Sequence, residues 1–86
     1  MEMHERVALY DACRDTATHV RGRLLAQMDR DESRGDQAAA GRTMDQVRAL
    51  NADVDAIDSN NREQMVAALD RWKAIIERDR VVRASA

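Results

Sequence analysis

The sequence has few residues of the kinds that interrupt helices or fill large cores. It contains no proline, no phenylalanine, three glycines and two aromatic residues, Tyr10 and Trp72. Good helix formers without such breakers favour helix over sheet. A core built from leucine, valine, isoleucine, methionine and alanine lets helices approach closely, but it fills little volume. The composition therefore predicts an all-α protein with a thin core.

Other absences exclude whole classes of protein. Cys13 is the single cysteine, which excludes an intramolecular disulfide framework and fits a reducing cytosol. No apolar run approaches the ~18 residues needed to span a membrane. The N-terminus also lacks the basic and then apolar order of a secretion signal. We therefore expect a cytoplasmic protein with no membrane contact.

The charge balance gives little sign of nucleic-acid binding. The net charge is −2, whereas nucleic-acid binders usually show a strongly basic face. Five basic residues do cluster near the C-terminus. They are Arg71, Lys73, Arg78, Arg80 and Arg83. This cluster leaves an anion-binding role as a minor alternative.

Apolar residues at spacings of three and four predict three amphipathic helices in a single domain spanning residues 1–86. The helices should cover about 3–30, 37–57 and 61–80. Their apolar stripes are Met3, Val7, Tyr10, Cys13, Ala17, Val20, Leu24 and Met28, then Ala40, Met44, Val47, Leu50, Val54 and Ile57, and then Met65, Leu69, Trp72 and Ile76. Short turns favour antiparallel neighbours, so we expect an antiparallel three-helix bundle with a long first helix. One end of that helix should project past the bundle and expose apolar residues.

Polar segments between the stripes predict the two turns. Residues 31–36 contain no apolar side chain, and Gly35 suits a left-handed helix end. Asp36 should then cap the second helix. Asn60 should cap the third helix, with Glu63 at the third helical position in a capping-box arrangement.

No constellation of residues predicts catalysis. His4 and His19 are fifteen residues apart on one predicted helix, about 22 Å by the helical rise, so they cannot share a metal ion. Cys13 lies on the apolar stripe, where a small buried side chain is a better interpretation than a nucleophile. There is no glycine-rich phosphate loop and no Ser/His/Asp set. We therefore predict a protein without enzyme activity, metal or cofactor, whose role is to bind another protein.

Residues 63–73, Glu-Gln-Met-Val-Ala-Ala-Leu-Asp-Arg-Trp-Lys, resemble the last helix of the epsilon antitoxins. These are small three-helix proteins that neutralise zeta toxins, and an acid, an apolar residue, alanine, an acid, tryptophan and a base recur in similar order. The resemblance implies that the N-terminal helix covers the nucleotide site of a zeta-type kinase, which otherwise phosphorylates a nucleotide-sugar precursor of the cell wall. Trp72 would stay in the core. By that analogy the residues contacting the toxin are Arg6, Leu9, Tyr10, Cys13 and Arg14.

A second likeness points to the same class. Residues 59–64 approach the Ser/Thr-x-x-x-Glu-Gly/Asn inhibitory motif of antitoxins that restrain Fic-type nucleotidyl transferases, but Gln64 replaces the final Gly or Asn. Helix capping explains Ser59, Asn60 and Glu63 more simply. The favoured interpretation is an antitoxin-like inhibitor that works in a complex with its protein partner. The alternative from another class is a structural or assembly protein that self-associates.

Overall fold

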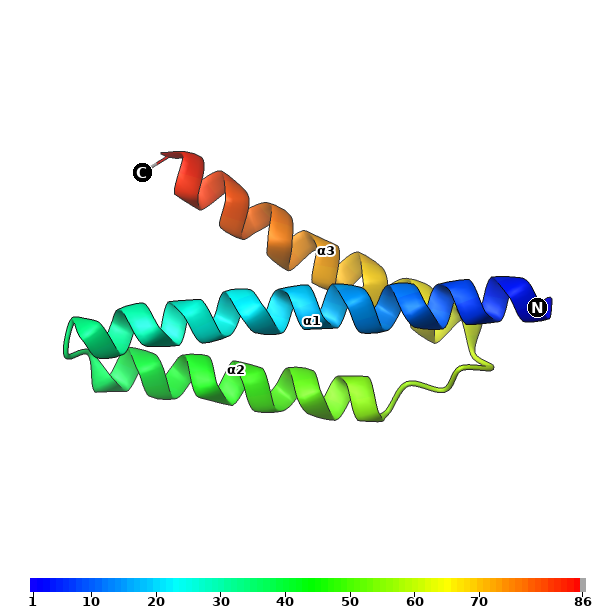
Figure 1. The fold of residues 1–86 in the computed structure, drawn as a ribbon, viewed down its shortest axis with the longest axis horizontal. Coiled ribbons are helices and arrows are strands. Elements are labelled where there is room, and N and C mark those ends of the chain that lie inside the picture. The colour runs from blue at the N-terminus through cyan, green and yellow to red at the C-terminus, as the bar shows by residue number, and fades with distance from the viewer. Residues whose placement is uncertain (86) are drawn as a thin grey trace.

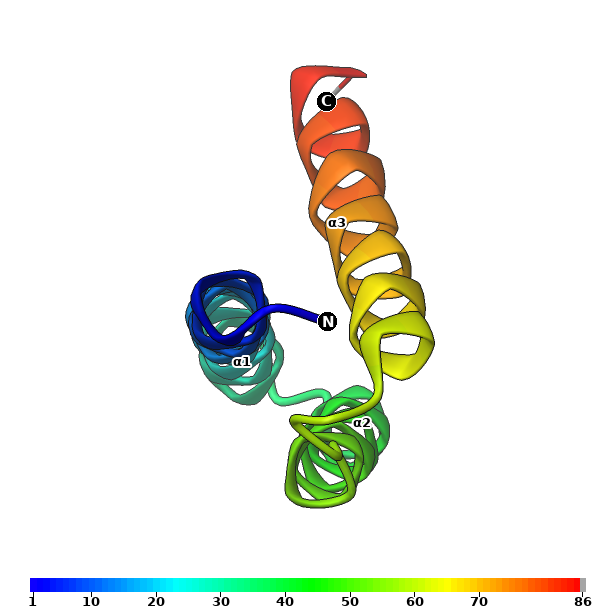
Figure 2. The ribbon, with the colours of Figure 1, turned by 90° about the vertical axis from the view of Figure 1, so that its right-hand side faces the viewer.

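The computed structural model describes residues 1–85, which form three helices (Figure 1). They are α1 (Met3–Ser33), α2 (Gln37–Asp55) and α3 (Arg62–Ser85). α2 returns antiparallel to α1, whereas α3 leaves α1 at an angle and its C-terminal end stands away from both other helices (Figures 1 and 2). The predicted three-helix bundle with a long first helix is confirmed.

The C-terminal ends of α1 and α2 differ from the predicted ends. α1 continues to residue 33, so the assignment of residues 31–33 to a turn was wrong. Asp31 is buried in the last turns of α1, where its carboxylate accepts a hydrogen bond from Gln27 Nε2 at 2.9 Å and pairs with Arg34. α2 ends at Asp55, two residues early, and Ile57 packs against the core from the connection that follows.

Backbone hydrogen bonds close the turn between α1 and α2. Gly35 has φ 77° and donates its N–H to the carbonyl of Glu32, while Asp36 donates to the carbonyl of Asp31, both at 2.9 Å. This is the Schellman arrangement of a helix end. Asp36 Oδ1 then accepts from the N–H of Ala39 at 3.0 Å and caps α2. The predicted roles of Gly35 and Asp36 are confirmed.

The start of α3 lies one residue later than predicted. Asn61, not Asn60, is the capping residue, because its Oδ1 accepts from the N–H of Gln64 at 3.0 Å. Gln64 therefore takes the third helical position expected for Glu63, and its Oε1 accepts a backbone hydrogen bond from the preceding connection at 2.7 Å. Asn60 Oδ1 instead accepts from Arg6 Nη1 at 2.7 Å, which ties the connection to α1.

The C-terminal part of α3 is helical for five residues beyond the predicted end at residue 80. Asp79 interrupts the apolar pattern but not the helix. Its carboxylate pairs with Arg23 of α1 and, at 3.4 Å, with Arg83 one turn further along α3. Ala86 lies outside the described residues.

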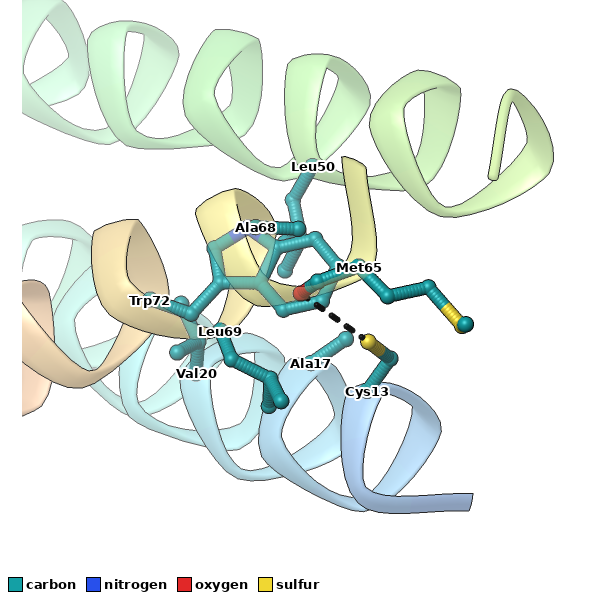
Figure 3. Packing of buried hydrophobic residues seen from close by; sticks show 8 residues of the cluster. All are labelled: Cys13, Ala17, Val20, Leu50, Met65, Ala68, Leu69 and Trp72. Atoms are coloured by element: carbon teal, nitrogen blue, oxygen red, sulfur yellow. Dashed lines mark hydrogen bonds between the residues drawn. The ribbon is translucent and has the colours of Figure 1, made fainter. Parts of the chain in front are cut away.

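One apolar cluster joins the three helices (Figure 3). Its buried members are Cys13, Ala17 and Val20 of α1, Leu50 of α2, and Met65, Ala68, Leu69 and Trp72 of α3. Trp72 and Met65 are its largest fully buried side chains. The predicted core position of Trp72 is confirmed, and α2 supplies this cluster with a single buried side chain.

Cys13 lies inside this cluster with no exposed surface. Its Sγ donates a hydrogen bond to the carbonyl of Met65 at 3.5 Å (Figure 3). Burial raises the pKa of the Cys13 thiol, because the thiolate loses hydration in the core. The thiol therefore behaves as a core group and is a poor nucleophile.

Two glycines should respond to the same substitution in opposite directions. A Cβ at Gly35 meets no atom within 4 Å, so the cost of Gly35→Ala arises from the positive φ alone, about 1–2 kcal/mol. A Cβ at Gly22, inside α1, also meets nothing within 4 Å, and Gly22→Ala should stabilise the protein by up to about 1 kcal/mol. Urea unfolding measures both changes. Equal effects of the two substitutions would contradict the turn geometry.

Cys13 should react slowly with thiol reagents in the folded protein and quickly in urea. Because its folded-state pKa is raised, its contribution to stability is complete below the ordinary thiol pKa. Stability is then lost as the pH rises through that value toward the raised one. The control Cys13→Ala should lack this alkaline loss of stability. Fast modification of the folded protein by Ellman's reagent would show that the thiol is accessible.

Candidate functional site

The apolar stripe of α1 is covered along its middle but not at its N-terminal end. Ala17 and Val20 are 1% exposed, whereas Met3 is 65% and Val7 is 52% exposed. α2 has already ended where the first turns of α1 pass (Figure 1). The expectation that one end of α1 exposes apolar residues is confirmed. We define the N-terminal surface by Met3, Val7, Tyr10, Asp11 and Arg14.

The contact residues implied by the antitoxin resemblance do not share one surface. Arg14 is exposed, and Arg6 is half-buried. Leu9 and Tyr10 are half-buried and pack against the core cluster. Cys13 lies within that cluster, beyond the reach of a partner in this conformation. Only Arg14 and the outer edges of its half-buried neighbours are available for contact.

Periodicity alone does not distinguish Met3 and Val7 from the buried members of the stripe. The expectation of an exposed end came from helix length. The predicted first helix of about 28 residues would extend about 42 Å, and the second of about 21 residues only about 31 Å. Two antiparallel helices that start from one turn can cover each other only along the shorter length. The first turns of α1 were therefore bound to lack α2 as a neighbour.

Polar contacts hold the N-terminal end of α1 in place. Glu5 Oε1 accepts from Arg62 Nε at 2.6 Å, next to the bond between Arg6 and Asn60. A shallow hollow of about 420 Å³ lies beside these contacts. It is lined by Arg6, Val7, Tyr10, Asp11 and Ser59. The end of the helix is thus anchored to the start of α3 while its apolar side faces solvent.

A second uncovered surface lies between α2 and the C-terminal half of α3. Within residues 1–85, no Cα atom of α2 comes within 8 Å of one in α3, because α3 diverges from the bundle. The divergence leaves a groove of about 560 Å³. Its apolar lining is Val20 and Leu24 of α1, Ala49 and Leu50 of α2, and Trp72, Ile75 and Val82 of α3. We call this the apolar groove.

Ion pairs cross the rim of the apolar groove. Arg23 pairs with Asp79, and Arg71 lies 3.7 Å from Asp53. The guanidinium of Arg71 also lies 5.9 Å from the ring centroid of Trp72, within cation–π range. Exposed pairs of this kind contribute about 1 kcal/mol or less each. They connect the helices across the groove without filling it.

The charges on the two walls of the apolar groove differ in sign. On the α2 wall the charged lining residue is Asp53, while the α3 wall carries Arg71, Arg78 and Asp79. Asp79 is engaged by two arginines, so the α3 wall presents mainly positive charge. No ion pair among the described residues involves Arg78.

The side chains of both surfaces suit binding by apolar burial and ion pairing. His19 Nε2 accepts a hydrogen bond from Arg23 Nε at 2.9 Å, so its ring is engaged by the neighbouring turn. In the part of the chain that the structure describes, no three His, Cys, Asp or Glu side chains gather as a metal site would require. Over the same residues, no helix combines the length and the apolar character needed to cross a membrane.

A scan against protein-family models and searches of curated proteins and solved structures find no significant match. The antitoxin resemblance of residues 63–73 therefore stays a prediction from that helix alone.

Proposed function

We propose that the protein is a non-catalytic regulator that binds another protein through the N-terminal surface. One observation carries this proposal. Met3 and Val7 continue the stripe of the buried Ala17 and Val20, yet the side chains of Met3 and Val7 are both more than half exposed. Covering a side chain of this kind completely contributes about 1.5–3 kcal/mol. A partner that packs on this end of α1 would gain the part of that contribution that belongs to the exposed half or more of each side chain.

The charge of this region supports a particular kind of partner. Residues 1–15 contain four acidic side chains and two arginines, and no ion pair among the described residues involves Asp11 or Asp15. An acidic helix end is complementary to a basic surface, such as the phosphate-binding site of a nucleotide-using enzyme. We therefore extend the proposal to antitoxin-like inhibition of a zeta-type kinase toxin, with the N-terminal surface covering its nucleotide site. The resemblance of residues 63–73 to the last helix of the epsilon antitoxins supports the same partner.

Substitution of Val7 should separate the N-terminal surface from the rest of α1. Val7→Asp introduces a charge into the proposed contact and should weaken partner binding about ten- to hundredfold, equivalent to the loss of about 1.5–3 kcal/mol. Leu25→Asp is the matched control, because Leu25 is also an exposed apolar residue of α1, 39% accessible, on the same side of the helix five turns away. Calorimetry with a purified zeta-type kinase measures both affinities. Equal loss in the two variants would rule out the N-terminal surface as the contact.

Inhibition is tested separately from binding. Co-expression of this protein with a zeta-type kinase toxin should restore growth that the kinase alone arrests, and Val7→Asp should abolish the rescue. The purified kinase should also lose activity when this protein is added. Full kinase activity in a stable complex would show that the protein binds without inhibiting, and the antitoxin proposal would then fail.

A further inference from the structure

All three helices line the apolar groove, and each does so with one narrow strip of its surface. On α1 the lining residues run from Val20 to Gln27 in steps of three, one and three, and on α2 they run from Gln46 to Asp53 in the same steps. Residues three and four apart are neighbours on one face of a helix, which is the face that a packed helix contacts. Because α3 diverges from α2, within residues 1–85 neither of these two helices covers the strip of the other (Figure 2). The lining thus has the pattern of a site for one further helix.

The dimensions of the apolar groove set the length of such a helix. At about 1.5 Å per residue, the strips on α1 and α2 are each about 11 Å long, and the strip of α3 from Arg71 to Val82 is about 17 Å long. One helical turn advances about 5.4 Å. The groove therefore matches a helix of about two to three turns.

The lining offers an apolar floor with partly open sides. The floor is formed by three buried side chains, Val20, Leu50 and Trp72. Leu24 and Ile75 beside the floor are half-buried, and Val82 at one end is 62% exposed. An apolar helix face laid on this floor covers the exposed parts of these side chains and removes its own apolar surface from water, which favours binding.

The charges of the lining favour an acidic occupant. Three arginines and two aspartates line the apolar groove, so the lining carries one more positive than negative charge. Arg23 pairs with Asp79. Arg71 pairs with Asp53, so both aspartates are engaged within the chain. Arg78 forms no ion pair with any described residue. A carboxylate on the occupant is therefore complementary to Arg78, whereas a basic side chain beside it is repelled.

We propose that the apolar groove binds an amphipathic helix of a partner protein, about two to three turns long, with its apolar face on the groove floor and an acidic residue beside Arg78. Such a helix adds a fourth member to the bundle and contacts all three helices of this chain. Amphipathic helices bind apolar grooves in this way, with apolar anchors at spacings of three and four. The apolar groove and the N-terminal surface are made of different residues, so each binds without blocking the other.

Three labelled synthetic peptides of about fourteen residues serve as probes. Two share a leucine seam at spacings of three and four and differ in the flanking residues, which are glutamate in one and lysine in the other. The third is the glutamate peptide with two central prolines, which prevent a helix. Fluorescence anisotropy with the full chain at low salt measures the affinities. The glutamate peptide should bind with a Kd below about 100 μM, the lysine peptide about three- to fivefold more weakly, and the proline peptide should not bind.

Arg78 should set the preference for the glutamate peptide. The net charge of the chain is −2, so non-specific attraction favours the lysine peptide, and a preference for glutamate must arise from the groove. Arg78→Glu should reverse the preference. Arg80→Glu is the matched control, because it makes the same change of charge on α3 at a residue that does not line the groove, and it should keep the preference for glutamate. Equal binding of the two peptides, or the same result from both variants, would overturn the proposal.

Two adjacent valines locate the binding. Val82 lines the apolar groove and Val81 does not, although their exposures are similar, 62% and 54%. Val82→Asn should weaken binding of the glutamate peptide about fivefold or more, because a polar side chain replaces an apolar contact. Val81→Asn should leave the affinity within about twofold. Far-UV circular dichroism checks that both variants keep their helices, and equal effects of the two substitutions would show that the peptide binds elsewhere.

Other occupants of the apolar groove give different results. A glutamate peptide that fails to bind, or a proline peptide that binds equally well, would overturn the proposal of a helical occupant. A free protein that sediments as a dimer, and that Val82→Asn dissociates, would assign the groove to a second copy instead. Val7→Asp should leave the peptide affinity unchanged, because Val7 lies on the N-terminal surface. Failure of this proposal and failure of the proposed function are therefore distinguishable.

Discussion

The packing of both shorter helices on α1 is the constraint on which the rest of the structure depends. Within residues 1–85, α2 and α3 share no close backbone contact, and they meet through side chains such as Leu50 in the core cluster and the ion pair between Asp53 and Arg71. A core without phenylalanine and rich in alanine holds α1 close to each neighbour but cannot fill a wide space between the neighbours. Because the core side chains do not fill that space, α3 diverges from α2 and the apolar groove stays open.

The same constraint leaves apolar residues uncovered at two separate places. At the N-terminus, α1 extends past the end of α2, so Met3 and Val7 lose the neighbour that the middle of the stripe has. In the groove, α3 diverges from α2, so Ile75 and Val82 line an open wall. The polar contacts at both places are ion pairs and hydrogen bonds at the surface. They orient the helices without covering the apolar residues beside them. Both surfaces are consequently suited to association, and they can serve different partners.

Local chemistry explains which predictions succeeded. Gly35 and Asp36 act through hydrogen bonds to residues within five positions, so their roles could be read from neighbouring residues. The start of α3 was misplaced by one residue because Asn60 and Asn61 are equally able to cap a helix, and the contact of Asn60 with Arg6 is formed only between segments distant in sequence. Asp79 interrupts the apolar pattern, and its pairing with Arg23 on α1 could not be foreseen from α3 alone.

The sequence by itself determined the three helices, their turn between α1 and α2, and the placement of Trp72 and Cys13 in the core, because periodicity and capping act over one or two turns. Only the tertiary structure decided which parts of each apolar stripe are covered. Periodicity assigns Met3 and Val7 the same role as Ala17 and Val20. Burial depends on where neighbouring helices end and at what angle they cross, and that is a property of the whole fold.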